Sequence, residues 1–84
     1  MKVRKVEDIE ISGLGDRIKK AREAHKSSLV QLAKVAKIDR SYWYDIEAER
    51  LSYPLPIETL RKIENVLGVK FLPSEERRSE KNKN

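Results

Sequence analysis

Arg40, Ser41, Tyr44 and Asp45 form the most chemically informative group of side chains in this sequence. Their spacing along a short predicted helix, over residues 39–47, places all four on its outer side. An arginine can donate two hydrogen bonds to guanine O6 and N7, and an aspartate can accept one from cytosine N4. The group is therefore a candidate for reading base edges of duplex DNA. The alternative is that Arg40 is a solvated surface residue or is paired with Asp45.

A second short helix precedes this group and must help to position it. Ser28 followed by Gln31 is a capping-box signal, which predicts a helix that starts at this point. The apolar positions that follow are typical of one helix face, and they are Leu29, Leu32, Ala33 and Ala36. The apolar pattern breaks at Lys37, where we expect this helix to end.

The outward-facing group lies on the helix that follows the break. Asp39 is its predicted cap, and Trp43 and Ile46 are its inward residues. Two short helices that cross around a buried apolar residue, here Ile38, make a helix-turn-helix unit. In DNA-binding versions of this unit, the second helix lies in the major groove.

Two further helices are predicted on either side of the unit. The first covers residues 14–25 and turns Leu14, Ile18 and Ala21 inward. The second has Pro56 in its first turn and ends at Gly68, with an apolar face made of Ile57, Leu60, Ile63 and Leu67. After this helix, we expect three apolar residues to fold back and close the core, namely Val69, Phe71 and Leu72.

The chain divides into three segments. Residues 1–13 are predicted to be an N-terminal arm, extended or in a short strand, because Ile9 and Ile11 alternate with polar neighbours. Residues 14–72 hold the folded domain, with twelve basic and eight acidic residues. Residues 73–84 carry no apolar residue after Pro73, so they are predicted to be a mobile charged tail.

The composition excludes several classes of function. The chain has 84 residues, a formal net charge of +5, no cysteine and one histidine, His25. Disulfides and thiolate metal sites are excluded, and there is no residue set for a zinc site or a catalytic centre. We therefore expect a protein that is not an enzyme, needs no cofactor or metal, and does not enter a membrane. Without cysteine or a signal peptide, a cytoplasmic protein is the natural expectation.

The sequence resembles the Cro / lambda-repressor-like helix-turn-helix family, also called XRE-type regulators. The resemblance covers about residues 14–71 and is carried by the segments RIKKARE, SLVQLAKVAKIDRSYWYDIE and PIETLRKIENVLGV. It implies an all-α fold, a compact bundle of four to five helices, here with a short N-terminal arm. It also implies a salt bridge between Arg22 and Glu47 that orients the second helix of the unit.

The resemblance assigns roles to individual residues. Arg40, Ser41 and Asp45 match positions that face base edges, and Tyr44 matches a position that reaches phosphate or a base. Ser28 and Leu29 match positions near a phosphate, which the start of a helix favours. Four residues that flank the second helix are expected phosphate contacts, although each could equally be a solvated surface residue: Lys34, Lys37, Arg50 and Tyr53.

The sequence also departs from the family pattern. Leu29 stands where a phosphate-binding glutamine is common, and Trp43 stands where the family usually has isoleucine or valine. Lys37 stands where glycine is usual, so it either adopts a left-handed conformation at a cost of about 1 kcal/mol or the turn differs. Residues 39–50 carry two basic and four acidic residues, an unusual charge for a surface that meets DNA.

The function expected from these patterns is that of a sequence-specific regulator of transcription, a repressor that binds duplex DNA. A homodimer is expected, because one unit reads only a few base pairs. Its contact would lie either in residues 57–72 or in the N-terminal arm. The alternative is a protein-interaction adaptor or an antitoxin-like module, which the acidic second helix favours. Single-stranded RNA binding is a third reading.

Overall fold

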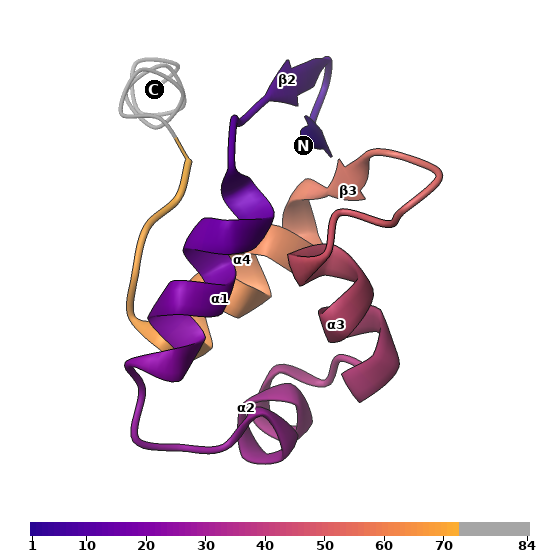
Figure 1. Ribbon diagram of the computed structural model, residues 1–84. Coiled ribbons are helices and arrows are strands. Elements are labelled where there is room, and N and C mark those ends of the chain that lie inside the picture. The colour runs from indigo at the N-terminus through magenta and orange to yellow at the C-terminus, as the bar shows by residue number, and fades with distance from the viewer. Residues whose placement is uncertain (73–84) are drawn as a thin grey trace, which may run out of the picture.

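The computed structural model describes residues 1–72, and the predicted tail, 73–84, lies outside them. Within these 72 residues, four helices pack around one core, and a small sheet lies at the end away from α2 (Figure 1). The elements in chain order are β1 (Lys2–Arg4), β2 (Asp8–Glu10), α1 (Leu14–Glu23), α2 (Leu29–Ala36), α3 (Arg40–Glu47), β3 (Leu55–Pro56) and α4 (Ile57–Leu67).

The sheet corrects the prediction of an all-α fold. Its strand order is β2-β1-β3, with β1 antiparallel to β2 and parallel to β3. Val3 is fully buried and pairs with Ile9 on one side and with Leu55 on the other. The alternation around Ile9 predicts an extended segment or short strand, and β2 forms there, but strands of two or three residues carry no signal for their partners. The pairing of Val3 with Leu55 joins distant parts of the chain. The segment predicted to be an arm therefore contributes to the core.

The two helices of the predicted unit begin at the residues that the sequence indicates. The hydroxyl of Ser28 accepts from the Gln31 amide at 3.2 Å, and the Gln31 side chain accepts from the Ser28 amide at 3.1 Å. The Asp39 carboxylate accepts from the amides of Ser41 and Tyr42 at 2.9 and 3.3 Å. Both predicted caps are confirmed.

Lys37 ends α2 in the left-handed conformation, with φ 60° and ψ 43°. Its amide donates to Lys34 O, and the amide of Ile38 donates to Ala33 O. These bonds satisfy carbonyls at the end of the helix, as glycine-terminated helices commonly do. The turn keeps its usual geometry without glycine. Gly68 ends α4 in the same conformation, with φ 70°.

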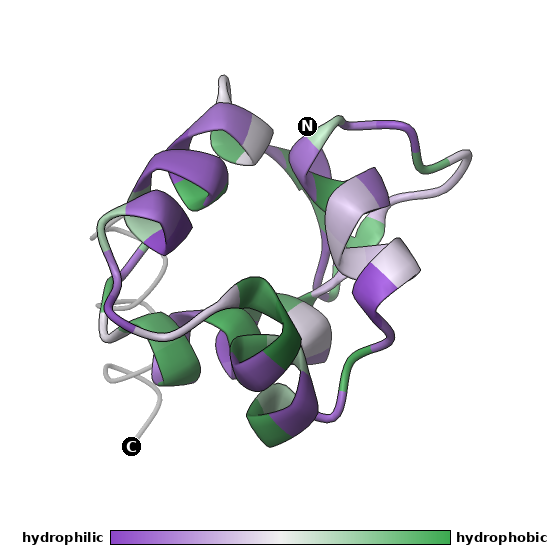
Figure 2. Ribbon diagram, turned by 60° about the horizontal axis from the view of Figure 1, so that its bottom comes forward, coloured by the Kyte–Doolittle hydropathy of each residue, from purple (hydrophilic) through white to green (hydrophobic). Residues whose placement is uncertain are grey.

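The core contains the inward residues that the helical patterns predict. Trp43 and Ile46 of α3 are fully buried, and the apolar faces of α1, α2 and α4 meet them. Hydrophobic and hydrophilic residues accordingly interchange along each helix (Figure 2). Of the three residues expected to close the core, Phe71 and Leu72 are buried, but Val69 is 38% exposed. The buried Glu64 carboxylate holds this segment by accepting from both buried residues' amides, at 2.7 and 3.1 Å.

Gly15 allows α1 to approach the end of α3 closely. A Cβ at this position would lie 2.3 Å from the carbonyl oxygen of Glu47. The Gly15 amide donates to Glu49 Oε2 at 2.9 Å. No larger residue fits this contact without a backbone shift, so this glycine helps to determine where α3 lies relative to α1.

Candidate nucleic-acid interface

The outer side of α3 carries the four residues predicted to read bases. Arg40, Ser41 and Tyr44 are exposed, and Asp45 is partly exposed. They share this side because Trp43 and Ile46 occupy the opposite one in the core. The structure therefore presents a guanidinium, two hydroxyls and a carboxylate along one helix, which are the groups that hydrogen bond to base edges and phosphates.

Asp45 is paired, and its partner is Arg50 rather than Arg40. The Arg50 guanidinium donates from Nη2 and Nε to Asp45 Oδ1, at 2.9 and 3.2 Å. Both side chains are substantially exposed, so the pair is screened by water and contributes little to stability. The pair matters for the local charge of the candidate interface, because it places the Arg50 cation beside the Asp45 carboxylate.

A groove of about 350 Å³ separates α2 from α3. It brings together three predicted contact residues, Lys34 of α2 and Arg40 and Ser41 of α3. Val30, which no sequence pattern indicates as a contact, also lines this groove and is half exposed. Lys34 is exposed. The groove thus combines two cations, a hydroxyl and the Asp39 carboxylate with three apolar side chains, of which Ala33 and Ile38 are buried and Val30 is exposed.

Arg22, Glu47 and Trp43 hold α3 against α1. Arg22 Nε and Nη2 donate to the two Glu47 oxygens at 2.5 and 3.0 Å, which confirms the salt bridge that the resemblance implied. Trp43 Nε1 donates to the same carboxylate at 2.8 Å. The hydrogen bonds to Glu47 raise the pKa of Arg22, although its burial acts in the opposite direction. Both side chains of the salt bridge are largely buried, so it is a constraint on helix orientation.

Tyr44 connects this cluster to the surface. Its ring lies 6.0 Å from the Arg22 guanidinium carbon, within the range of a cation–π contact. One side of the ring is thus placed by α1, while the residue as a whole remains half exposed on α3. Arg22 therefore orients a predicted contact residue as well as the helix that carries it.

Leu29 can meet the predicted phosphate only through its backbone, since its side chain is 6% exposed and belongs to the core. The reason is its place on the apolar face of α2, beside Leu32 and Ala33. Backbone amides in the first turn of a helix have no partner within the helix, and they are what this region can offer to an anion. Ser28, the cap of α2, is exposed.

The remaining predicted contacts lie at the edges of α3. Lys37 is exposed in the turn before α3, and Arg50 and Tyr53 are exposed in the segment after it. Burial and the neighbouring Tyr53 hydroxyl raise the pKa of Tyr42. Tyr53 thus borders on α3 and faces solvent.

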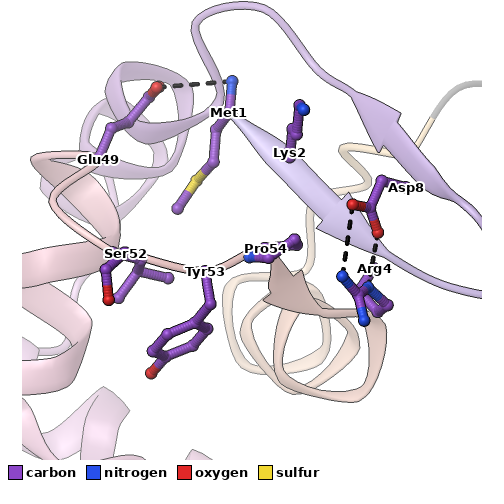
Figure 3. A pocket seen from close by; sticks show the side chains of 9 residues that line it. Met1, Lys2, Arg4, Asp8, Glu49, Ser52, Tyr53 and Pro54 are labelled. Carbon is purple, nitrogen blue, oxygen red and sulfur yellow. Dashed lines mark hydrogen bonds and ion pairs between the residues drawn. The ribbon is translucent and has the colours of Figure 1, made fainter.

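Tyr53 also lines a second pocket, of about 450 Å³, between the N-terminal strands and the segment after α3 (Figure 3). Most of its charges are paired: Arg4 Nε donates to Asp8 Oδ1 at 2.6 Å, and the Met1 ammonium lies 3.5 Å from Glu49 Oε1. No local sequence pattern indicates this pocket, because it joins residues about fifty positions apart. None of the residues that line this pocket belongs to α3, so we do not include it in the candidate interface.

Within residues 1–72 there is no group of three or more acidic or histidine side chains placed to hold a metal ion. None of the helices in this part of the chain has the length and apolar character needed to cross a membrane.

The chain matches a family model described as helix-turn-helix over residues 18–72. The match begins within α1, includes α2, α3 and α4, and ends at Leu72. The strands β1 and β2 precede the matched residues. No curated protein and no solved structure gives a significant match.

Proposed function

This chain belongs to the XRE-type helix-turn-helix family of DNA-binding transcription regulators, and we propose that it is a repressor that inserts α3 into the major groove of an operator. The observation that carries the proposal is the polar outer side of α3, held in place by the Arg22–Glu47–Trp43 cluster. A recognition helix must be rigidly placed, because hydrogen bonds to base edges depend on sub-ångström positioning.

The roles of the contact residues follow from their chemistry. Arg40 donates two hydrogen bonds to a guanine, Ser41 hydrogen bonds to a neighbouring base, and Asp45 accepts from a cytosine amino group. Five residues around them contact phosphates and position the protein: Tyr44, Lys34, Lys37, Arg50 and Tyr53. The first turn of α2, which begins after Ser28, supplies amides to a further phosphate.

The charges around α3 support DNA binding over the protein-interaction alternative. That alternative drew on the acidity of residues 39–50, but each of the four acids there has a partner within the chain. Asp39 caps α3, and Asp45 pairs with Arg50. Glu47 binds Arg22 and Trp43, and Glu49 accepts from the Gly15 amide. Opposite charges thus stand beside three of the four acids before DNA approaches: Arg50 at Asp45, Arg22 at Glu47 and the Met1 ammonium at Glu49.

We propose that the operator is bound by a homodimer. A two-fold dimer would place two α3 helices about 34 Å apart, one turn of DNA, on a pseudo-palindromic site. The segment 57–72 is the better candidate for the contact, since Val69 near its end is exposed. The N-terminal isoleucines are less available, because Ile11 is buried and Ile9 packs against the core of its own chain.

Selection from a random duplex pool tests the proposal. Binding is followed by fluorescence anisotropy at low and moderate salt, and the bound fraction is sequenced. We expect steeply salt-dependent binding that enriches a short, two-fold-related site. Enrichment of no sequence would leave a non-specific DNA binder. Absence of binding at low salt would favour the protein-partner alternative, which a pull-down of a stoichiometric partner would then support.

A further inference from the structure

We propose that Val30 determines specificity by contacting the 5-methyl group of a thymine next to the base read by Arg40. The inference rests on the proposed function and adds a residue on α2 to the base-reading surface. It names a preference for one base, thymine, at a defined place in each half-site.

The position of Val30 on α2 turns it toward the groove between α2 and α3. It follows Leu29, whose side chain enters the core, and the rotation of about 100° per helical residue brings Val30 to the surface. Lys34 lies one turn later on the same side. Val30 is 52% exposed and lines the groove together with Lys34, Arg40 and Ser41.

The chemistry of the groove selects a methyl group. Arg40, Ser41 and Lys34 offer hydrogen bonds or charge, whereas Val30 has no donor or acceptor. On the major-groove edges of the four bases, the thymine methyl is the apolar feature, and the other groups are hydrogen-bond donors and acceptors. A valine placed against those polar groups would remove water from them without replacing its hydrogen bonds. Against a thymine methyl, both apolar surfaces leave water together.

Val35 provides a matched control on the same helix. It is the same residue type and is more exposed, at 72%, but it is not among the residues that line the groove. It lies five positions after Val30, a rotation of about 140° that places it on a different side of α2. Replacing either valine by alanine removes the same atoms from an exposed position, so both variants should retain the fold, which far-ultraviolet circular dichroism would verify.

The experiment replaces thymine by deoxyuridine, one position at a time, in the operator obtained by selection. This change removes the methyl group and leaves the hydrogen-bonding edge intact. For the wild-type protein and V35A, we expect one thymine per half-site where the loss of the methyl weakens binding about fourfold, the value of one buried methyl group. For V30A, the same replacement should have no effect, because the contact is already absent.

Two outcomes would overturn the inference. If deoxyuridine weakens binding of V30A as much as that of the wild type at every thymine, another residue reads the methyl group. If no thymine replacement affects the wild type, Val30 contacts the sugar–phosphate backbone or nothing. Either result would leave the selected operator, and so the proposed function, intact. A failure to select any operator would instead remove the proposed function and this inference with it.

Discussion

The indole nitrogen of Trp43 donates a hydrogen bond of 2.8 Å to Glu47, one turn further along α3. This relationship explains how a tryptophan serves at a position where the resemblance leads one to expect isoleucine or valine. The ring fills the centre of the core, while its N–H satisfies a carboxylate that Arg22 already contacts with two nitrogens. The departure from the family pattern thus strengthens the contact that orients the recognition helix.

Replacing Glu47 by alanine should destabilise the protein by about 3 kcal/mol, because it leaves the largely buried Arg22 guanidinium without its partner. Urea denaturation measures the change in the free energy of unfolding. The control is D16A, which breaks the exposed Asp16–Lys20 pair and should cost less than about 1 kcal/mol. Equal effects in the two variants would show that the Arg22–Glu47 pair has no special role.

Replacing Arg40 by alanine should weaken binding to the selected operator by about 1–3 kcal/mol and relax the preference for one base pair in each half-site. The reason is the loss of a two-pronged contact to guanine. Anisotropy titrations against the operator and its single-base variants measure both effects. The control is K20A, which removes an exposed cation on α1, outside the proposed DNA and dimer contacts. Binding of R40A as tight and as selective as that of the wild type would contradict the assignment.

Replacing Lys34 by alanine should weaken binding to all duplexes nearly equally, because a phosphate contact carries no sequence information. The slope of log K against log salt concentration should fall by about one. Titrations at several salt concentrations, on the operator and on an unrelated duplex, give the slope. A change in sequence preference with an unchanged slope would show instead that Lys34 contacts a base.

Replacing Lys37 by glycine should stabilise the protein by up to about 1 kcal/mol, because Lys37 holds a left-handed conformation in which a Cβ is unfavourable. The reciprocal change, G68A, should destabilise by a similar amount: Gly68 has φ 70°, and its surroundings leave room for a methyl group. Thermal and urea denaturation measure both. Shifts of the same sign in the two variants would contradict the argument from backbone strain.

The stability contributed by Tyr42 should depend on pH in the alkaline range. Its pKa is raised above the usual value, by burial first and by Tyr53 second, so the folded state binds the phenol proton more tightly than the unfolded state does. This contribution is complete below about pH 10 and is lost as pH rises through the raised pKa. Above about pH 10, the free energy of unfolding of the wild type should therefore fall relative to that of Y42F.

The control for this pH dependence is Y44F, which changes a half-exposed tyrosine on the outer side of α3. Urea denaturation of the three proteins at pH 8 and at pH 10.5–11 measures their free energies of unfolding. Each variant is compared with the wild type at the same pH, because the lysines that all three share titrate alike and cancel in the difference. If the free energies of unfolding of the wild type and Y42F change by the same amount across this pH range, the prediction is contradicted.

Much of the helical fold could be read from neighbouring residues. Ser28 and Asp39 were predicted as caps, and the helix was expected to end at Lys37. The apolar faces that bury Trp43 and Ile46 were also recognised. These features rest on hydrogen bonds and side-chain directions that span a turn or two of helix. The outward group of the candidate site followed in the same way, as the complement of the buried face.

The sheet, the Gly15 contact and the pairing of Asp45 were decided only by the tertiary structure. Val3 meets Leu55, and Gly15 meets the backbone of Glu47, across long stretches of chain. Arg50, in the segment after α3, is brought back to Asp45. The groove that joins Val30 to Arg40 likewise exists only once α2 and α3 are packed. Sequence alone thus determined the helices and their outward faces, because each depends on a local hydrogen-bond and apolar pattern. Packing decided which surfaces meet, because contacts between distant residues leave no periodic signal in the chain.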